Sequence, residues 1–167
     1  MKFIKHLLPL LLVATLGTAL CDAKPLNVPD DESPFASIEF PKDWETDTIE
    51  NGVVGTSPDG AVYLAVVGVT NEKGMNAEID STFAMLQEQK VELDESSKKE
   101  NKFKINGFDA QELLFQGKDA DGPAAISITF VPIKDKLIVF TYWVSTEDEA
   151  KHQQTVGKIV NSLKPAK

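Results

Sequence analysis

Residues 57–69 read SPDGAVYLAVVGV, and the fold prediction begins from this stretch. Pro58 is pre-set for a tight turn and Gly60 can adopt positive φ, a combination that predicts a β-hairpin turn. Residues 61–69 are then almost continuously apolar over the length of one strand. Such a run predicts a central strand that is covered on both faces.

Short strands are predicted before this turn. Residues 35–40 are the first ordered element, which ends at Pro41, and residues 44–49 form a second strand. Asn51-Gly52 predicts a tight turn into a third strand at residues 53–56.

The hydrophobic period changes after the central strand. Ile79, Phe83 and Leu86 recur at i, i+4 and i+7, which predicts an amphipathic helix over residues 76–89 with Asn76 as its N-cap. The polar residues 94–101 are expected to connect this helix back to the sheet.

The second half of the chain again places strands before a helix. Asn106-Gly107 predicts a hairpin between residues 103–105 and 108–115, and two further strands are expected at 124–131 and 137–144. Thr146 and Glu149 have the spacing of a capping box that opens the last helix. The inner face of that helix is predicted to consist of Ala150, Val156, Ile159, Val160 and Leu163. The fold class is therefore α+β, a mostly antiparallel sheet packed by two main helices.

The N-terminus has the order of features of a secretion signal. Lys2 and Lys5 precede an apolar run at residues 7–16, which is shorter than the roughly 20 residues that cross a bilayer, and small residues follow. We therefore expect residues 1–23 to be a signal peptide, with cleavage after Cys21 or Ala23. Residues 24–34 form an acidic, proline-rich leader, expected to be loose, and residues 35–167 form a single domain.

Cys21 is the only cysteine, so the chain can form no internal disulfide. It could be the lipidated first residue of a bacterial lipoprotein. Leu20, however, stands where such signals carry a small residue. The sequence therefore favours a soluble periplasmic or extracellular protein over a lipid-anchored one.

The charge of the chain excludes some partners. The net charge is −9 and no arginine is present; removal of the signal takes away two lysines and one aspartate, which leaves the remainder more acidic. An acidic chain repels nucleic acid and anionic membrane surfaces, and the lack of arginine argues against a phosphate site. Lys98, Lys99, Lys102 and Lys104 are interpreted as guards of a strand edge.

No catalytic residue, cofactor site or metal site is predicted. His152 would be the only histidine after cleavage, and its polar neighbours indicate a solvated helix position. A nucleophile with a base in reach and a Gly-x-Ser-x-Gly motif are both missing from the sequence. Asp119-Ala120-Asp121-Gly122 is interpreted as a plain hairpin loop, because an EF-hand would need further ligands and a closing glutamate.

Two tryptophans are the candidate partner contacts. Trp44 could cover the core or form part of a binding surface. Trp143 follows Tyr142 on a strand, so alternation sends the two to opposite faces and can leave one exposed. Exposed aromatic side chains are frequent anchors of protein interfaces.

Three segments together resemble the PsbP-like superfamily, nearest its bacterial DcrB-type branch. They are FASIEFPKDWETDTIENGVVGTSPDG at residues 35–60, NGFDAQELLF at residues 106–115, and YWVSTEDEAKHQQTVGKIVNSLK at residues 142–164. The resemblance implies a sheet sandwiched by helices, an α/β/α arrangement. It also implies a non-enzymatic role, since members include an accessory photosynthetic subunit, envelope lipoproteins and effector chaperones.

Two functional hypotheses follow. The first is an exported, non-enzymatic accessory domain that binds an unknown protein partner in the bacterial cell envelope. The second is a carrier of an apolar small molecule or lipid between sheet and helix, lined by Phe83, Leu86 and Val66. An enzyme that uses paired carboxylates is disfavoured, because an acidic composition places such pairs everywhere.

Overall fold

The predicted central strand is confirmed as β5 (Val62–Val69). In the computed structural model, which describes residue 23 and residues 25–166, β5 lies inside a seven-stranded sheet of order β3-β4-β5-β9-β8-β7-β6. Both of its neighbours pair with it antiparallel. Seven of its eight residues are buried, because layers cover both faces of the sheet.

Neighbouring strands of this sheet are all antiparallel, as the hairpin signals predict. The turn at Asn106-Gly107 has φ values of 44° and 88°, which suit a tight hairpin. The other strands are β3 (Glu45–Ile49), β4 (Gly52–Thr56), β6 (Glu92–Ile105), β7 (Phe108–Lys118), β8 (Pro123–Ile133) and β9 (Lys136–Ser145).

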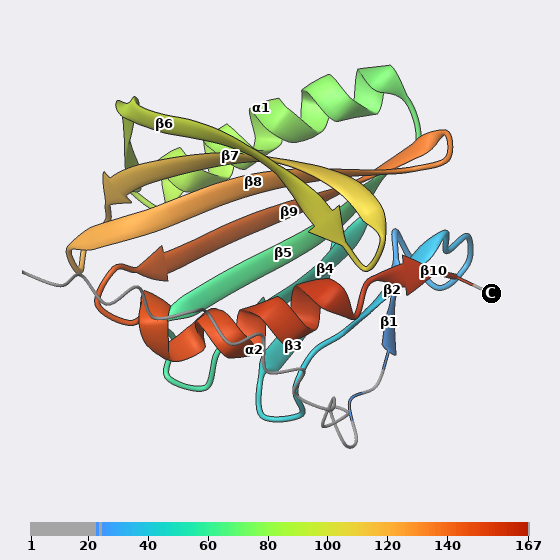
Figure 1. Cartoon of the computed structure of the whole chain (residues 1–167), viewed down its shortest axis with the longest axis horizontal. Coiled ribbons are helices and arrows are strands. Elements are labelled where there is room, and N and C mark those ends of the chain that lie inside the picture. Colours follow the sequence, from blue (N-terminus) through green and yellow to red (C-terminus); the bar gives the residue numbers. More distant parts are fainter. Residues whose placement is uncertain (1–22, 24, 167) are drawn as a thin grey trace, which may run out of the picture.

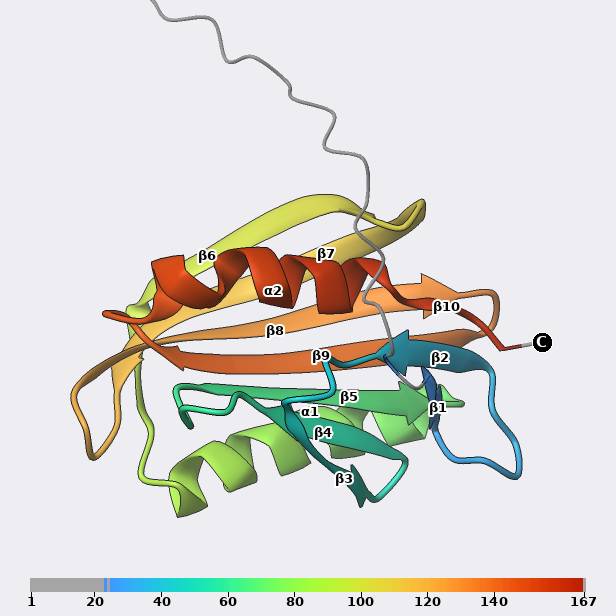
Figure 2. The same cartoon turned by 90° about the horizontal axis from the view of Figure 1, so that it is seen from below.

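Two helices cover the opposite faces of the sheet. In Figure 1, α2 (Glu149–Asn161) lies in front of the strands and α1 (Glu72–Glu88) lies behind them, and Figure 2 shows the sheet between the two helices. The α+β class and the helix–sheet–helix layering are thereby confirmed. Neither of these helices, within the described residues, combines the length and the apolar character needed to cross a membrane.

A second, three-stranded sheet corrects the expectation of a loose leader. Part of residues 24–34 is strand β1 (Pro25–Val28), which pairs with β2 (Ala36–Glu39), and β10 (Lys164–Pro165) pairs with the other side of β2. Val28 is fully buried. An edge strand tolerates proline because its outer N–H groups need no partner, so the prolines did not prevent this pairing.

Both helices begin differently from the prediction. α1 starts four residues before Asn76, since the side chain of Asn71 accepts a hydrogen bond from the backbone N–H of Gly74 at 2.9 Å. α2 follows Asp148, which makes no side-chain cap, and the Thr146 hydroxyl donates to the carbonyl of Pro123 at 2.7 Å. The predicted capping box is therefore not formed.

The expectation that the polar residues 94–101 form a connector is wrong. They belong to β6, an outermost strand of the large sheet. A register shift between Asp94 and Lys99 interrupts its pairing with β7. Its side chains are mostly exposed, and its lysines lie on the free edge, in agreement with their interpretation as guards.

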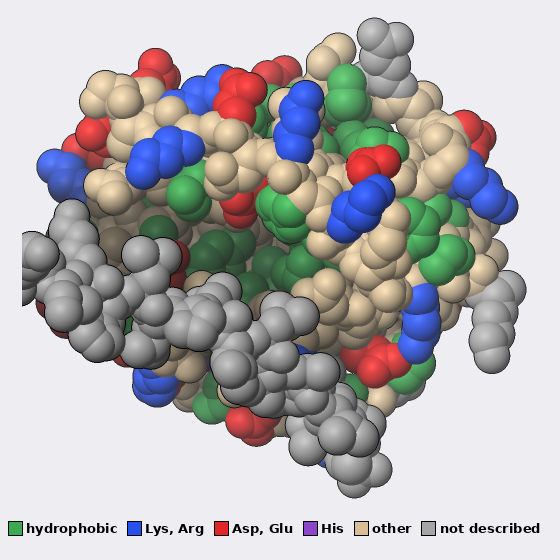
Figure 3. Space-filling view, viewed as in Figure 1, with side chains coloured by type: hydrophobic (Ala, Val, Ile, Leu, Met, Phe, Trp, Pro, Cys, Tyr) green, Lys and Arg blue, Asp and Glu red, His purple; other side chains and the backbone are tan. Residues whose placement is uncertain are grey.

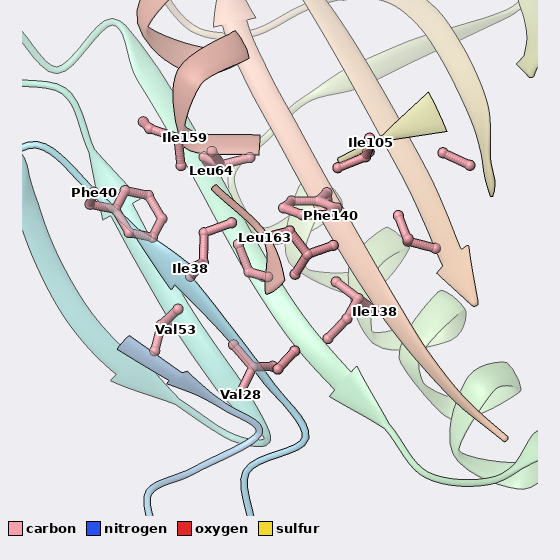
Figure 4. Close-up of a cluster of buried hydrophobic side chains, with 14 of the residues drawn as sticks. Val28, Ile38, Phe40, Val53, Leu64, Ile105, Ile138, Phe140, Ile159 and Leu163 are labelled. Carbon is pink, nitrogen blue, oxygen red and sulfur yellow. The ribbon is translucent and has the colours of Figure 1, made fainter. Parts of the chain in front are cut away.

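The largest core cluster joins the two sheets to α2. Ile38 of β2, Phe140 of β9 and Ile159 of α2 meet there, each at most 2% exposed (Figure 4). Leu163 is also fully buried, whereas Ala150 is exposed and does not belong to the inner face of α2. The first buried position of α2 is instead His152.

Candidate functional site

A carboxylate joins the turn at residues 57–60 to the first turns of α2. The Ser57 hydroxyl donates to Asp59 Oδ1 at 2.6 Å, and Asp59 Oδ2 lies 3.0 Å from His152 Nε2. The Lys151 ammonium donates to the same carboxylate. His152 is 8% exposed, so the expectation of a solvated histidine is wrong. This contact could not be predicted from the sequence, because Asp59 and His152 lie far apart along the chain.

The same contacts tie the turn to α2. The Ser57 hydroxyl accepts from the backbone N–H of Val62 at 3.0 Å and donates to Asp59, and no hydrogen bond joins it to His152 among the described residues. A serine nucleophile needs its base in hydrogen-bond reach. Hydrogen bonds from Lys151 and then Ser57 hold the pKa of Asp59 well below its usual range. Asp59 therefore anchors the β4–β5 turn to α2.

Asp59→Asn is expected to lower the free energy of unfolding at pH 7 by about 1 kcal/mol, because the carboxylate is partly screened by water. Since the pKa of Asp59 is lowered in the folded state, its contribution is complete above the ordinary aspartate pKa and is lost as the pH falls below it. The difference between wild type and variant should therefore shrink from pH 5 downward. Urea titrations at pH 7, 5, 4 and 3 measure it; a difference that stays constant across this series contradicts the assignment.

The two tryptophans are largely enclosed. Trp44 is 6% exposed and its ring lies 5.9 Å from that of Phe40. Trp143 is half-buried, and its indole N–H donates to Asp119 Oδ2 at 2.9 Å. Tyr142 and Trp143 pack into different clusters, which agrees with the predicted alternation. Neither tryptophan is in the exposed class, whereas a third aromatic residue is.

That residue is Phe103, which sequence reasoning missed. At 41% exposure it is the only large hydrophobic side chain that is exposed within the described residues. It lines an open hollow of about 310 Å³ with Ala110, Phe130 and Pro132, which we call the Phe103 hollow. The available signal was a single aromatic residue among the charged and polar residues 98–104, which read KKENKFK.

A groove separates α2 from the strands beside it. It measures about 370 Å³, and we call it the α2 groove. Its apolar walls include Leu64 and Phe140 from the sheet and Val156 and Val160 from the helix. Figure 3 shows hydrophobic side chains at the bottom of a hollow on this face. Phe103 lines the groove as well as the Phe103 hollow.

Hydroxyl groups lie within the α2 groove. Ser127 and Thr129 of β8 are each 5% exposed, and neither hydroxyl has a hydrogen-bond partner among the described residues. Tyr142 also lines the groove, and burial, followed by the charge of Glu149, raises the pKa of its phenol. Glu112 and Glu149 contribute carboxylates. The groove is thus apolar with an electronegative polar side.

The α1 side of the sheet holds separate hollows. One of about 650 Å³ is lined by Phe83 and Leu86 together with Phe115. Val66 does not line it, because Val66 packs in the core cluster on the α2 side. The three residues named for a carrier site therefore do not share one cavity. Another hollow contains Tyr63 and Glu78, and burial is the main cause that raises the pKa of each.

Metal-ligating side chains do not cluster in residues 25–166: no group of three or more His, Cys, Asp or Glu residues is placed to hold an ion. Asp119 instead closes its own hairpin loop, as its Oδ1 accepts from the backbone N–H of Gly122 at 3.0 Å. The loop joins β7 and β8, as interpreted from the sequence. The expected signal peptide and Cys21 lie outside the described residues, apart from Ala23.

The fold defined by this sheet and its two helices is PsbP-like. The solution structure of cyanobacterial PsbP (CyanoP) from Synechocystis is similar with a TM-score of 0.58 at 11% identity, over 93% of this chain and 99% of that one. LpqN of Mycobacterium tuberculosis, described as involved in cell envelope biogenesis, gives 0.50 at 15% identity, over 87% and 91% of the two chains.

A protein of Bacteroides thetaiotaomicron gives a TM-score of 0.54 at 14% identity; the match covers 80% of this chain and 46% of that one. No family model and no curated sequence matches the chain. At these identities the likeness establishes the fold alone.

Proposed function

We propose that this chain is an exported, non-enzymatic accessory domain of the bacterial cell envelope that binds a protein through the Phe103 hollow. The observation that carries the proposal is the exposure of Phe103 on an edge strand, directly after nine polar residues at 94–102. An exposed aromatic ring costs solvation free energy, and such rings are preferred anchors of protein interfaces.

Charged side chains surround the Phe103 hollow and could form the polar rim of an interface. Lys102 and Asp109 border the hollow, and the apolar surface between them comes from Ala110, Phe130 and Pro132. Interfaces commonly combine an apolar centre with a polar rim. The lysines on β6 also oppose the addition of a partner strand, so we assign the contact to side chains rather than to the strand edge.

Two further observations support an accessory role. The best serine–aspartate–histidine arrangement is a turn anchor, with the serine hydroxyl directed at the carboxylate. One structural neighbour is described as involved in cell envelope biogenesis, and another is a PsbP protein. The N-terminal signal pattern supports export, although its residues lie mostly outside the described part of the chain.

Site-specific cross-linking tests the protein contact. A photo-reactive phenylalanine analogue is placed at position 103 of the full-length chain in its bacterial host, with the exposed Glu88 of α1 as the control position. We expect a discrete cross-linked product from position 103 and none from position 88. Phe103→Ser should weaken binding of that partner about thirty-fold or more, because anchors contribute about 2 kcal/mol or more, and should reduce its co-purification accordingly. Equal products from both positions, or none from position 103, would overturn the contact.

Export is tested separately by the mass of the mature protein. We expect a chain that begins at Asp22 or Lys24 in the periplasmic or culture fraction. A product that begins at Cys21 and carries the added mass of a lipid would show that the protein is exported but anchored to the membrane by that lipid. An unprocessed chain confined to the cytoplasm would overturn export.

A further inference from the structure

One face of β8 departs from the pattern of a buried strand. Both of its faces are covered, and a strand of this kind normally carries apolar side chains on each. Ile126 and Ile128 satisfy this on the α1 side, whereas Ser127 and Thr129 occupy the α2 side. Both hydroxyl-bearing residues are 5% exposed.

These hydroxyls have no partner within the described protein. Among the described residues, every side-chain nitrogen or oxygen atom that is fully closed to solvent has a hydrogen-bond partner, so the two hydroxyls stay accessible through the α2 groove. A ligand group in the groove could therefore hydrogen-bond with them.

Gly157 keeps space free on the helix side of the same groove. It lies inside α2, where glycine is less favourable than alanine by roughly 1 kcal/mol. A Cβ built at this position meets no atom within 4 Å. Close packing therefore does not require the glycine, and the space beside it is open.

The charges around the groove are mainly negative. Glu112 accepts a hydrogen bond from the Asn101 amide at 2.8 Å. The negative charge of Glu149 adds to burial in raising the pKa of Tyr142. Lys104 is the cation that lines the groove, and its ammonium lies 2.7 Å from Asp109. A carboxylate ligand would meet repulsion here, whereas an amine would be attracted.

From this geometry we infer that the α2 groove binds a small amphipathic molecule that has an aliphatic or aromatic body and a neutral hydroxyl or cationic amine head. Val156 and Val160 contact the body above the buried Leu64 and Phe140, and Ser127 and Thr129 hydrogen-bond with the head. The volume of about 370 Å³ falls within the range of small-molecule sites. The inference does not depend on the protein contact proposed for Phe103.

Three probes of equal length test the head-group preference. Hexylamine, hexanol and hexanoate are titrated into the ¹⁵N-labelled protein of residues 24–167 at pH 7, and amide shifts are followed around Gly157 and Thr129. We expect saturable shifts with the amine and the alcohol, and binding of hexanoate about ten-fold weaker or more, which corresponds to about 1.4 kcal/mol of charge repulsion. Equal binding of the three probes, or no saturable shift with any of them, would overturn the inference.

Two variants with matched controls test the location. Gly157→Leu should fill the open space and weaken the binding of hexylamine and hexanol. Ala84→Leu, at an exposed position of α1, is its control. Thr129→Val should weaken hexanol about three-fold or more through one lost hydrogen bond. Thr141→Val is its control, because Thr141 is similarly buried, at 3% exposed against 5%, but pairs with Ile128 on the α1 face. Unchanged binding in both groove variants would place the probes elsewhere, whatever the cross-linking at position 103 shows.

Discussion

Gly52→Ala is expected to lower the free energy of unfolding by about 3 kcal/mol or more, one of the largest effects of a single added methyl group in this chain. A Cβ at this position would lie 2.2 Å from the backbone carbonyl oxygen of Val66, and real Cβ atoms do not approach so closely. The clash is with backbone rather than with a flexible side chain, so β4 would have to move away from β5. That movement would break the pairing beside the central strand.

Urea denaturation followed by tryptophan fluorescence measures this effect. Gly157→Ala is the matched control, since the same methyl group meets no atom and removes a helix glycine. The control should be unchanged or more stable by up to about 1 kcal/mol. A Gly52→Ala protein within 1 kcal/mol of wild type would show that β4 and β5 are less closely paired than described.

Gly52 also shows what local sequence reasoning can and cannot provide. Asn51-Gly52 is a turn signal and the turn is present, with Asn51 at a φ of 57°. Gly52 itself does not have positive φ; it is needed because the β5 backbone lies against it. The turn could be predicted from two adjacent residues, but the close approach depends on a strand contributed by residues further along the chain.

The same distinction explains the other differences. Periodicity found both helices and the central strand, because each is encoded within one window of sequence. It assigned residues 94–101 to a connector, since an exposed edge strand carries polar residues on both faces. It placed leader residues outside the fold, although Val28 is buried against the main core. Edge pairing depends on a partner strand that the local pattern does not identify.

The candidate site was harder to predict than the fold. Trp44 and Trp143 were chosen as contact candidates because they are aromatic, but exposure depends on packing, and packing buried Trp44 and left Phe103 exposed. Ser127 and Thr129 alternate with isoleucines, a pattern also typical of a strand with one face in water. Only the placement of α2 reveals that their face is covered. His152 likewise gained a partner from a turn almost a hundred residues away.

Phe140→Ala is expected to lower the free energy of unfolding by about 3–5 kcal/mol, because it deletes a ring at the centre of the largest core cluster. Phe140 is 2% exposed and packs among residues from both sheets and α2 (Figure 4). The surrounding strands are paired on both sides, so they can close only part of the space that the ring leaves. Guanidinium denaturation at pH 7 provides the measurement.

Phe103→Ala is the matched comparison, since it removes the same ring from an exposed position. It should change stability by no more than about 0.5 kcal/mol, because an exposed ring stabilises the folded state little. If Phe103→Ala destabilised the protein as strongly as Phe140→Ala, Phe103 would belong to the core, and its exposure could no longer be attributed to binding. Loss of stability at position 140 without loss at position 103 would separate a residue kept for folding from one that folding does not require.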